Sequence, residues 1–525
     1  MTTNRDAPGP SAYPVSSTLL NPRDLQDAAP LPLSDFLEAH PERCTAHPYL
    51  PDVARIEEIT HRLKKSPPVV YREVDALTVN PTLELLPVGW EGLPAFVKDR
   101  SSTPRPGSAH VLVVKRPGSE DVEVRTAEPA DLLALKIVVE EREPRRVASD
   151  CGVPVGSVDD VLHRAVHRGL LLAPASRIQR SADFPRGVVA DPSRLSSPTF
   201  TLQWHITQAC DLDCRHCYDR SERSPMPLKQ GIGVLDDLYD FCREHHVYGQ
   251  ISFSGGNPLL YPHFDRLYRE AAHRGFLTAV LGNPAPRRRI ERMLAVRKPE
   301  FYQISLEGLA SHNDSIRGSG HWERSMAFLD TLGELGVYRM VMLTLTRDNV
   351  DQVIELAHRL RGRAEHFTFN RLAPVGRGAD LAPVAPERYR SFLSEYMDAA
   401  GENPIMGLKD NLFNWLLHQG GRRLGGGCAG HGCGAAFNFV ALLPDGEVHA
   451  CRKLPSLIGN IYRNRLAEIY HSRQARRYRL GTTACSGCDI RPVCGGCPAV
   501  VHGLGGDVFH DRDPYCIAFE NLHHR

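Results

Sequence analysis

The sequence lacks an excess of charge of either sign and any long run of apolar residues. Its 525 residues include 63 lysines and arginines against 62 aspartates and glutamates, so no net basic field attracts nucleic acid or an anionic membrane. No apolar stretch approaches the roughly 18 residues of a membrane span. The N-terminus also lacks the basic and then apolar profile of a signal peptide. We therefore expect a cytoplasmic protein whose partners include neither nucleic acid nor a membrane.

Cysteine, by contrast, is abundant and unevenly placed. Of 14 cysteines, only Cys44, Cys151 and Cys242 stand alone, and the others fall into spaced groups. In a reducing compartment, grouped thiols are more often metal ligands than disulfide partners. With 42% hydrophobic and 24% charged residues, the chain has the composition of a globular protein, and its length predicts two to four domains.

The first 70 residues read as an N-terminal extension. Residues 1 to about 30 are rich in Pro, Ser, Ala and Asp without periodicity, which predicts a disordered or loosely attached segment. Short helices are expected near residues 34–40 and over residues 51–63, where Val53, Ile56, Ile59 and Leu63 fall on one face.

Residues 71–174 predict a winged-helix domain. Two strand patterns, 110–115 and 121–125, flank a turn, and helical patterns follow over residues 129–141, 144–151 and 155–168. In a DNA-binding winged helix the last helix enters the major groove, but here Asp159 and Asp160 lie beside its arginines, a poor surface for phosphates. Residues 175–198 read as a linker.

From residue 199 onward, apolar strands recur at distances that leave room for a helix between them. The predicted strands are residues 200–208, 250–254, 278–281, 302–306, 340–345 and 366–371. Six such units predict an α/β fold, a partial (β/α)6 barrel of the TIM type over residues 199–400, with function at the carboxyl ends of its strands.

Three cysteines follow directly after the first of these strands. Cys210, Cys214 and Cys217 fall within eight residues, and thiols with this spacing can converge on one four-iron cluster. Because such a cluster has four corners, three thiolates leave one iron free to bind a small molecule. A structural zinc site is the simpler alternative.

This loop, with Tyr218 after it, resembles the cysteine motif of the radical S-adenosylmethionine (SAM) enzymes. The resemblance implies that Cys210, Cys214 and Cys217 hold a 4Fe-4S cluster whose open iron takes the amino and carboxylate groups of SAM. It also implies that an electron cleaves SAM and that the resulting 5′-deoxyadenosyl radical abstracts a hydrogen atom.

Further motifs at the strand ends resemble the SAM contacts of that family. The SGGNP run of residues 254–258 resembles the GGEP motif, with Asn257 in place of the usual acid; its amide oxygen can accept a hydrogen bond from the SAM ammonium but brings no countercharge. Arg317 resembles the arginine that pairs with the SAM carboxylate, a task that suits a bidentate guanidinium. The implied SAM contacts are Tyr218, Gly255, Gly256, Asn257, Pro258, Ser305, Glu307, Arg317 and, beside the adenine, Leu372.

Residues 401–525 carry eight more grouped cysteines, the number needed for two complete four-iron clusters. Their spacing resembles the SPASM domain of radical SAM peptide-modifying enzymes, although only Gly495 and Gly496 stand where the family usually has three residues. The family scheme implies one auxiliary cluster on Cys428, Cys433, Cys451 and Cys497 and a second on Cys485, Cys488, Cys494 and Cys516. Two zinc sites are the alternative.

Together these resemblances imply a radical SAM/SPASM maturase that installs a thioether or another crosslink in a ribosomally made peptide. Residues 71–174 resemble PqqD-like recognition domains, in which the hairpin and the last helix bind a leader peptide by strand addition. SAM, three 4Fe-4S clusters, a precursor peptide and an electron donor such as flavodoxin or ferredoxin are the implied cofactors and partners.

Two weaker resemblances and alternatives stay open. The run from Gly255 to Tyr261 and residues 48–55 resemble thio(seleno)oxazole-modification maturases. The alternative enzyme is an anaerobic sulfatase-maturing formylglycine former, although that subgroup has an aspartate where this chain has Arg452. The alternative from another class is an iron-sulfur redox or sensor protein that does not use SAM.

Overall fold

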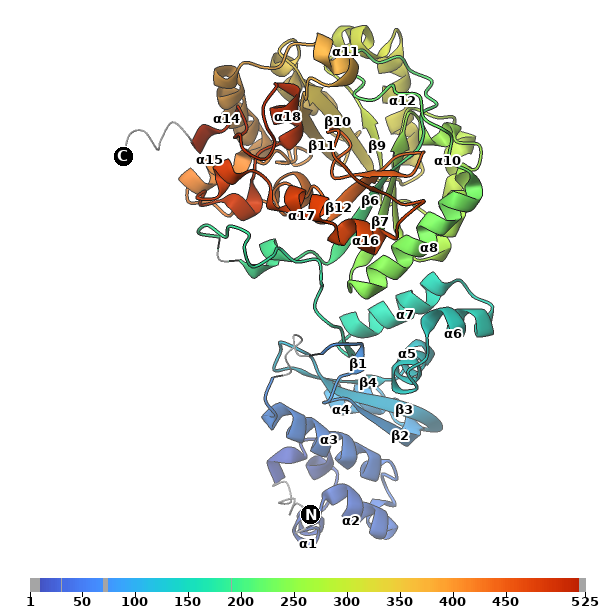
Figure 1. The fold of residues 1–525 in the computed structure, drawn as a ribbon. Coiled ribbons are helices and arrows are strands. Elements are labelled where there is room, and N and C mark those ends of the chain that lie inside the picture. The colour runs from blue at the N-terminus through green and yellow to red at the C-terminus, as the bar shows by residue number, and fades with distance from the viewer. Residues whose placement is uncertain (1–9, 30, 69–73, 190, 519–525) are drawn as a thin grey trace. The chain divides into compact units, whose positions relative to one another are not determined.

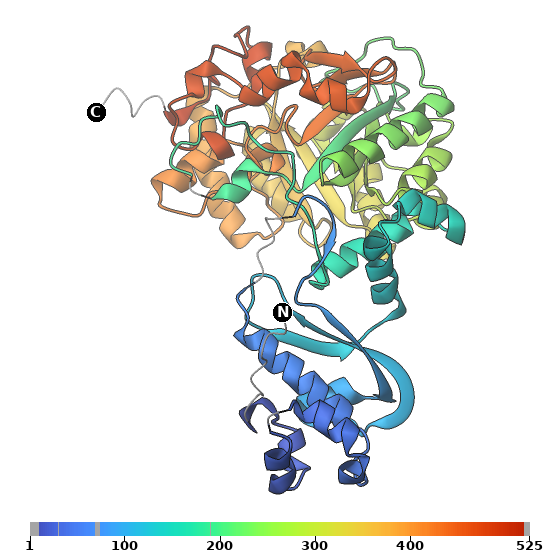
Figure 2. The same ribbon diagram turned by 60° about the horizontal axis from the view of Figure 1, so that its bottom comes forward.

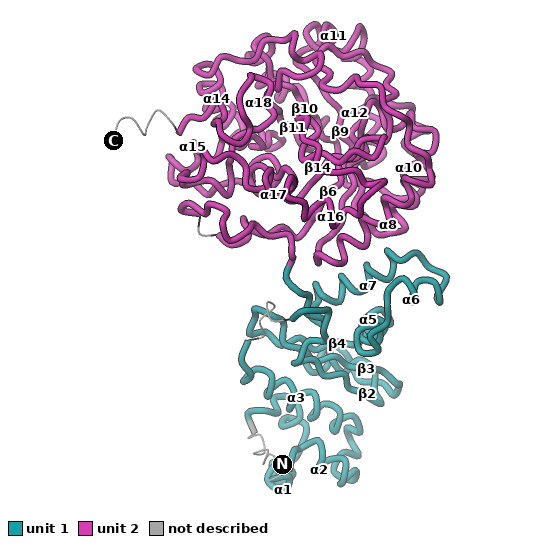
Figure 3. The backbone as a smooth tube through the Cα atoms, viewed as in Figure 1, with its two compact units in different colours: residues 1–175 teal, residues 176–525 magenta. Residues whose placement is uncertain are grey.

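The computed structural model describes residues 10–29, 31–68, 74–189 and 191–518. The chain divides into two compact units, residues 1–175 and 176–525 (Figure 3). The expectations for residues 1–9 and 71–73 and for the last seven residues lie outside the described parts. Each unit is considered by itself.

The first unit combines a helical segment with two small sheets (Figure 1). Its sheets have the orders β1-β5 and β2-β3-β4, all antiparallel. The elements in chain order are α1 (Pro22–Asp27), α2 (Leu33–Ala39), α3 (Leu50–Lys65), β1 (Thr78–Val79), β2 (Glu84–Glu91), α4 (Leu93–Asp99), β3 (Arg105–Lys115), β4 (Val122–Thr126), α5 (Pro129–Val139), α6 (Pro144–Cys151), α7 (Val155–His167) and β5 (Leu171–Leu172).

The segment from residue 10 to residue 29 is packed rather than loose, which corrects the sequence expectation. Tyr13 and Leu20 are buried in a core with α2 and α3, and Val15 joins a core formed by α3 and the sheet β2-β3-β4. Glu57 on α3 accepts hydrogen bonds from the Val15 and Ser16 backbone N–H groups, at 2.5 and 3.1 Å, and from the Ser16 hydroxyl at 2.6 Å. These contacts are made across about forty residues and leave no local pattern in the sequence.

Replacing Glu57 by alanine is expected to release this segment. The change leaves two buried N–H groups without an acceptor, which costs about 1–3 kcal/mol. Hydrogen exchange followed by mass spectrometry should show faster exchange over residues 10–20, while Glu42→Ala, an exposed carboxylate on the same unit, should leave exchange there unchanged. Equal protection in both variants would contradict the role given to Glu57.

The predicted hairpin and the three helices after it are confirmed as elements. Strands β3 and β4 pair in the register Val113↔Val124, and α5, α6 and α7 pack with β3 around a core that includes Leu112, Leu135 and Leu162. Strand β2 and helix α4 were not predicted. The winged-helix classification of this unit stays a prediction.

Strand β4 forms an edge of its sheet, with no strand paired to its outer side in the described part of the chain. Ala127 N–H donates to the His110 carbonyl, and Arg116 N–H to the Asp121 carbonyl. Because antiparallel ladders alternate, the backbone groups of residues 123 and 125 face β3 as well. The N–H and C=O groups of Val122, Val124 and Thr126 therefore face outward.

The second unit contains a nine-stranded, mostly parallel sheet. Its order is β11-β10-β9-β8-β7-β6-β12-β13-β14. Six consecutive parallel strands match the predicted ones closely: β6 (Thr199–Thr207), β7 (Tyr248–Gly255), β8 (Leu277–Leu281), β9 (Phe301–Ser305), β10 (Arg339–Leu345) and β11 (His366–Arg371). The helices between and after them are α8 (Leu228–Glu244), α9 (Phe264–His273), α10 (Arg287–Leu294), α11 (Ala310–Arg317), α12 (His321–Glu334), α13 (Val353–Arg359) and α14 (Pro386–Glu402).

The C-terminal cysteine-rich region continues this sheet instead of forming a detached layer. Strand β12 (Phe439–Leu442) pairs in parallel with β6, and β13 (Glu447–His449) and β14 (Leu457–Asn460) follow in antiparallel order. Figure 2 shows this orange and red segment lying across the sheet. Its helices are α15 (Phe413–Gln419), α16 (Leu466–His471), α17 (Arg473–Leu480) and α18 (Pro498–Gly503).

Residues 176–189 and 191–197 are anchored and do not behave as a free linker. The Arg180 guanidinium lies between the rings of Phe184 and Phe437 and donates to the carbonyls of Cys433 and Arg479, at 2.8 and 2.7 Å. Burial lowers the pKa of Arg180 to about 9. The segment thus ties the start of the sheet to one of the cysteine loops.

In the described residues, no helix combines the length and the apolar character that a membrane crossing would need.

Candidate active site

A cavity of about 180 Å³ lies at the carboxyl ends of the parallel strands. Its wall brings together most of the residues that the sequence singled out. These are Cys210, Cys214, Cys217, Tyr218, Gly255, Gly256, Ser305, Arg317 and Leu372. Asn257, Pro258 and Glu307 do not line it.

The three thiols are held on a loop that neighbouring segments fix in place. Arg215 N–H donates to the Ile316 carbonyl, and Arg377 N–H donates to the Cys217 carbonyl. Burial raises the pKa of Cys214, and the positive charge of Arg317 opposes that rise. Three thiols open to one cavity, with a cation beside them, are a donor set that fits a three-cysteine cluster.

Gly255 and Gly256 allow the end of β7 to approach the cysteine loop. A Cβ atom on either residue would lie 2.2 Å from a backbone oxygen, that of Thr207 or that of Ala209. Gly255 also has a φ of 130°, which side chains disfavour. The resemblance implied these glycines as SAM contacts, and the structure shows that the packing of the loop itself also requires them.

Asn257 is buried and its side chain is already engaged. Its amide nitrogen donates to Asp211 Oδ1 at 3.0 Å, and its oxygen accepts from Leu259 N–H at 3.2 Å. Asn283, which does line the cavity, donates to the same Asp211 oxygen at 2.6 Å. Asn257 therefore supports the turn and Asp211 through its side chain, and its contact with SAM stays a prediction.

Glu307 stands behind the wall, where it holds Arg317. Its Oε1 accepts from Arg317 Nε and Nη2 at 2.9 and 2.6 Å, and its Oε2 accepts from Thr344 N–H at 2.8 Å. Burial acts to raise the pKa of Glu307, but His216, Arg317 and the Thr344 N–H together lower it. Glu307 is therefore a buried carboxylate that orients Arg317. Ser305 lines the cavity.

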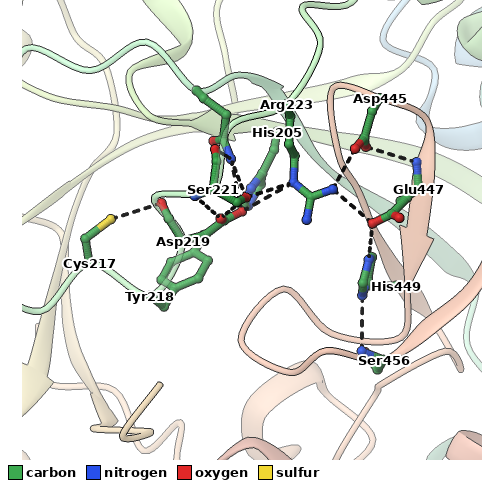
Figure 4. A network of polar contacts seen from close by, with 11 residues as sticks. His205, Cys217, Tyr218, Asp219, Ser221, Arg223, Asp445, Glu447, His449 and Ser456 are labelled. Carbon is green, nitrogen blue, oxygen red and sulfur yellow. Dashed lines mark hydrogen bonds and ion pairs between the residues drawn. The ribbon is translucent and has the colours of Figure 1, made fainter. Parts of the chain in front are cut away.

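A network of polar side chains connects the cysteine loop to β13 (Figure 4). The Tyr218 hydroxyl lies 3.0 Å from His205 Nε2. Arg223 donates to Asp445 and to Glu447, at 2.7 and 2.9 Å, and Glu447 lies 3.1 Å from His449 Nε2. Burial lowers the pKa of His205 to about 3, so this histidine is neutral at physiological pH. The sequence carried no signal for this network, because its members are far apart along the chain.

A second cavity, of about 390 Å³, lies on the sheet side of the C-terminal region. Cys428, Cys433, Cys451 and Cys497, the set implied for the first auxiliary cluster, all line it. Burial raises the pKa of Cys433 to about 11, and Cys428 and Cys451 add to the rise. The four thiols thus meet at one cavity from three separate segments.

The other four cysteines also gather. Burial raises the pKa of Cys485 and of Cys494, and each thiol is close enough to Cys488 and Cys516 for their charges to raise it further. Among the described residues, no three His, Cys, Asp or Glu side chains are close enough to hold a single metal ion. Both ligand assignments stay predictions.

Several residues that line these cavities were not among the predicted site residues. Arg452 and Lys453 follow Cys451, and Gln303 and Asn370 lie on inward positions of β9 and β11. Polar residues within apolar strands were the available signal, since a packed barrel interior has little place for them. Burial, followed by the charge of Arg452, lowers the pKa of Lys453 to about 8.

Two family models match the chain. The radical SAM superfamily model matches residues 204–360, and the iron-sulfur cluster-binding SPASM domain matches residues 433–498. Together they span the region that holds all eleven grouped cysteines except Cys428 and Cys516.

Among curated proteins, the mycofactocin maturase MftC of Mycolicibacterium smegmatis is 30% identical over 63% of this chain and 86% of its own length. An AdoMet-dependent heme synthase of Methanosarcina barkeri is 27% identical over 60% of this chain and 95% of its own. Among solved structures, Streptococcus suis SuiB bound to its precursor peptide SuiA aligns with a TM-score of 0.52 and 17% identity, over 78% of this chain and 96% of SuiB. At that identity the likeness to SuiB shows the fold alone.

Proposed function

Because the chain belongs to the radical SAM superfamily and carries a SPASM domain, with SAM, a 4Fe-4S cluster and auxiliary clusters as its cofactors, we propose that it modifies a ribosomally made peptide. When bound, the three-cysteine cluster supplies the electron that cleaves SAM to a 5′-deoxyadenosyl radical, which takes a hydrogen atom from the peptide. The main support for this proposal is the cavity at the strand ends, into which Cys210, Cys214 and Cys217 open beside Arg317. The likeness to a peptide maturase supports a peptide as the substrate.

Different residues of the cavity wall bind the cluster and the different parts of SAM. Cys210, Cys214 and Cys217 hold the cluster. Arg317, fixed by Glu307, pairs with the SAM carboxylate. The remainder of SAM contacts other residues of the cavity wall, namely Tyr218, Gly255, Gly256, Ser305 and Leu372. Asn257 and Pro258 support the turn after β7.

The two C-terminal cysteine sets would hold auxiliary clusters, which would supply an acceptor for the electron left on the peptide after hydrogen abstraction. All their ligands are protein thiols in the proposed scheme, so no iron is left open for substrate. Cys428, Cys433, Cys451 and Cys497, which line one cavity, would hold the first cluster. A flavodoxin or ferredoxin supplies the electrons that start the reaction.

The outer edge of β4 receives the leader of the precursor peptide. Its outward N–H and C=O groups are arranged to pair with an added strand, and they lie on a unit separate from the catalytic one. This role, and the PqqD-like character of the first unit, is supported by the free edge and by the order of hairpin and helices.

The test uses anaerobically reconstituted protein with SAM, dithionite and a synthetic peptide encoded by a short open reading frame beside the gene. We expect 5′-deoxyadenosine by chromatography and a change in the peptide's mass that requires SAM. Protein that forms no 5′-deoxyadenosine would disprove SAM cleavage. If SAM is cleaved but no peptide encoded by any neighbouring small reading frame is modified, a peptide substrate would be ruled out.

Val124→Pro is expected to weaken leader binding about 2- to 12-fold, because proline removes one outward donor of β4 and a backbone hydrogen bond contributes about 0.5–1.5 kcal/mol. Proline is tolerated there since the Val124 N–H is not used by β3. Fluorescence anisotropy of a labelled leader measures the affinity. Val124→Ala, which keeps the donor, serves as the control, and equal affinities for the two variants would exclude strand addition at this edge.

The alternative of a sulfatase-maturing formylglycine former shares the same two matched domains. It is disfavoured by Arg452, which stands in the wall of both cavities where that subgroup has an aspartate. When a sulfatase peptide that contains the target cysteine or serine is incubated with the enzyme, mass spectrometry should therefore show no change in the mass of the peptide.

A further inference from the structure

The two cavities of the second unit share part of their walls. The residues common to both are Leu281, Gln303, Met342, Asn370, Arg452 and Lys453. A group that enters the first cavity next to the cysteine loop therefore touches the same side chains that border the second. The side chains of this shared wall are the ones a reacting residue would meet.

The inner face of the sheet at the second cavity is polar but almost free of charge. Thr201 and Gln203 on β6, Ser252 on β7 and Thr368 and Asn370 on β11 line it. Amide and hydroxyl groups of this kind orient a polar ligand by hydrogen bonds. They provide no countercharge.

Three cations in these walls have no carboxylate partner among the described residues. Arg452 and Lys453 form no ion pair, and Lys409 Nζ lies 3.1 Å from Asn370 Oδ1, which is neutral. The other arginines of the walls are matched: Arg371 with Asp410 and Asp513, Arg317 with Glu307, and Arg220 with Asp213. The other arginines of these walls are thus each neutralised by a carboxylate, which sets Arg452, Lys453 and Lys409 apart from them.

All three are partly buried, and unpaired cations that have lost part of their hydration are costly, so an anion is expected to compensate them. A four-iron cluster bound by four thiolates carries a net charge of about two negative units in its oxidised state. That charge offsets part of the three positive ones, and Cys451 is adjacent to Arg452. It leaves one positive charge over, and Arg452 and Lys453 border the first cavity as well as the cavity of the four cysteines.

We propose that Arg452 and Lys453, with Lys409 behind them, bind a carboxylate of the peptide residue that is presented for hydrogen abstraction. The substrate class is thus a peptide with an acidic side chain, or its own C-terminal carboxylate, at the reacting position. A guanidinium beside an ammonium suits a carboxylate, because charge-assisted hydrogen bonds are about twice as strong as neutral ones. This inference rests on the proposed function.

The test is an anaerobic calorimetric titration of reconstituted holoenzyme saturated with SAM, so that the SAM carboxylate is already accommodated. Three probes separate the sources of the carboxylate: N-acetylglutamate α-amide carries it on the side chain, N-acetylglycine carries it at the C-terminus, and N-acetylglutamine α-amide carries none. At least one carboxylate probe should bind at least tenfold more tightly than the neutral probe. The tighter of the two identifies the source.

The variant Arg452→Gln/Lys453→Gln should lose this preference, whereas Arg347→Gln, which removes an exposed arginine, should keep it. Iron content and SAM affinity are measured on each variant as controls of folding and loading. Equal binding of charged and neutral probes by the unchanged enzyme would overturn the proposal. A double variant that still prefers the carboxylate probes would also overturn it. The same holds for a double variant that loses SAM affinity instead of this preference, and for one in which only the midpoint potential of an auxiliary cluster shifts. Failure of SAM cleavage, measured separately on the unchanged enzyme, would instead refute the proposed function.

Discussion

Replacement of Cys210, Cys214 and Cys217 by alanine is expected to abolish 5′-deoxyadenosine formation, down to the level of an enzyme-free control. The three thiols open to the cavity at the strand ends and are the proposed ligands of the cluster, so without them neither the cluster nor its open iron should form. Iron content should fall by about four per chain, from about twelve, because each 4Fe-4S cluster carries four irons. Chromatography of the reaction and colorimetric iron analysis measure the two effects.

The matched control is Cys151→Ala, which removes an exposed cysteine on α6. It should retain both the iron and the activity. An iron content near four in the unchanged protein would refute the two auxiliary clusters while leaving the catalytic one intact. Activity retained in the triple variant would refute the whole assignment of the cysteine loop.

Arg317→Gln is expected to raise the dissociation constant for SAM about 10- to 100-fold. A hydrogen bond to a charged group contributes about 1.5–3 kcal/mol, and each 1.4 kcal/mol is about tenfold in affinity. Glu307→Gln should act differently, because it leaves the buried Arg317 guanidinium without its carboxylate. Breaking a buried pair from one side costs about 3–5 kcal/mol, which should appear as a lower unfolding midpoint in urea.

The double variant Glu307→Gln/Arg317→Gln separates the two roles. It should recover much of the stability lost in Glu307→Gln, since no buried charge is left unpaired, but it should still bind SAM weakly. Equilibrium titration with SAM and urea unfolding of all three proteins provide the readouts. A double variant that recovers SAM affinity would show that Arg317 acts only in folding.

The parallel strands could be predicted because short segments rich in apolar residues recur at distances that leave room for a helix between them. Strand β11 occupies the predicted residues, His366–Arg371, and the cysteine loop follows β6 as expected. The spacing of the cysteines supported the resemblance to the SPASM family, and that resemblance implied the two ligand sets. The strands β12, β13 and β14 were missed, since each has four residues or fewer and their partners are set by tertiary pairing.

Side-chain direction was the part that the sequence could not provide. Asn257 and Glu307 both follow a strand that ends at the cavity, but neither lines it, and their side chains are bonded to Asp211 and Arg317 respectively. The turn after a strand decides which way such a residue points, and this depends on contacts with distant segments. The same reason applies to residues 10–29, whose burial depends on acceptors on α3.

The pairing of β12 with β6 has a consequence for how the protein is made. Phe439 pairs with Thr201, so the two strands are separated by roughly 240 residues, and a contact of such long range forms late because of the entropy of closing the chain. At typical synthesis rates of about 5–20 residues per second, β6 waits on the order of ten seconds or more on the ribosome before its partner emerges. During that time β6 presents an unpaired edge, which is a site for association with other nascent chains. Overexpression without chaperones or with a truncated C-terminus is therefore expected to yield aggregates, and slower translation of residues 208–438 should make them worse.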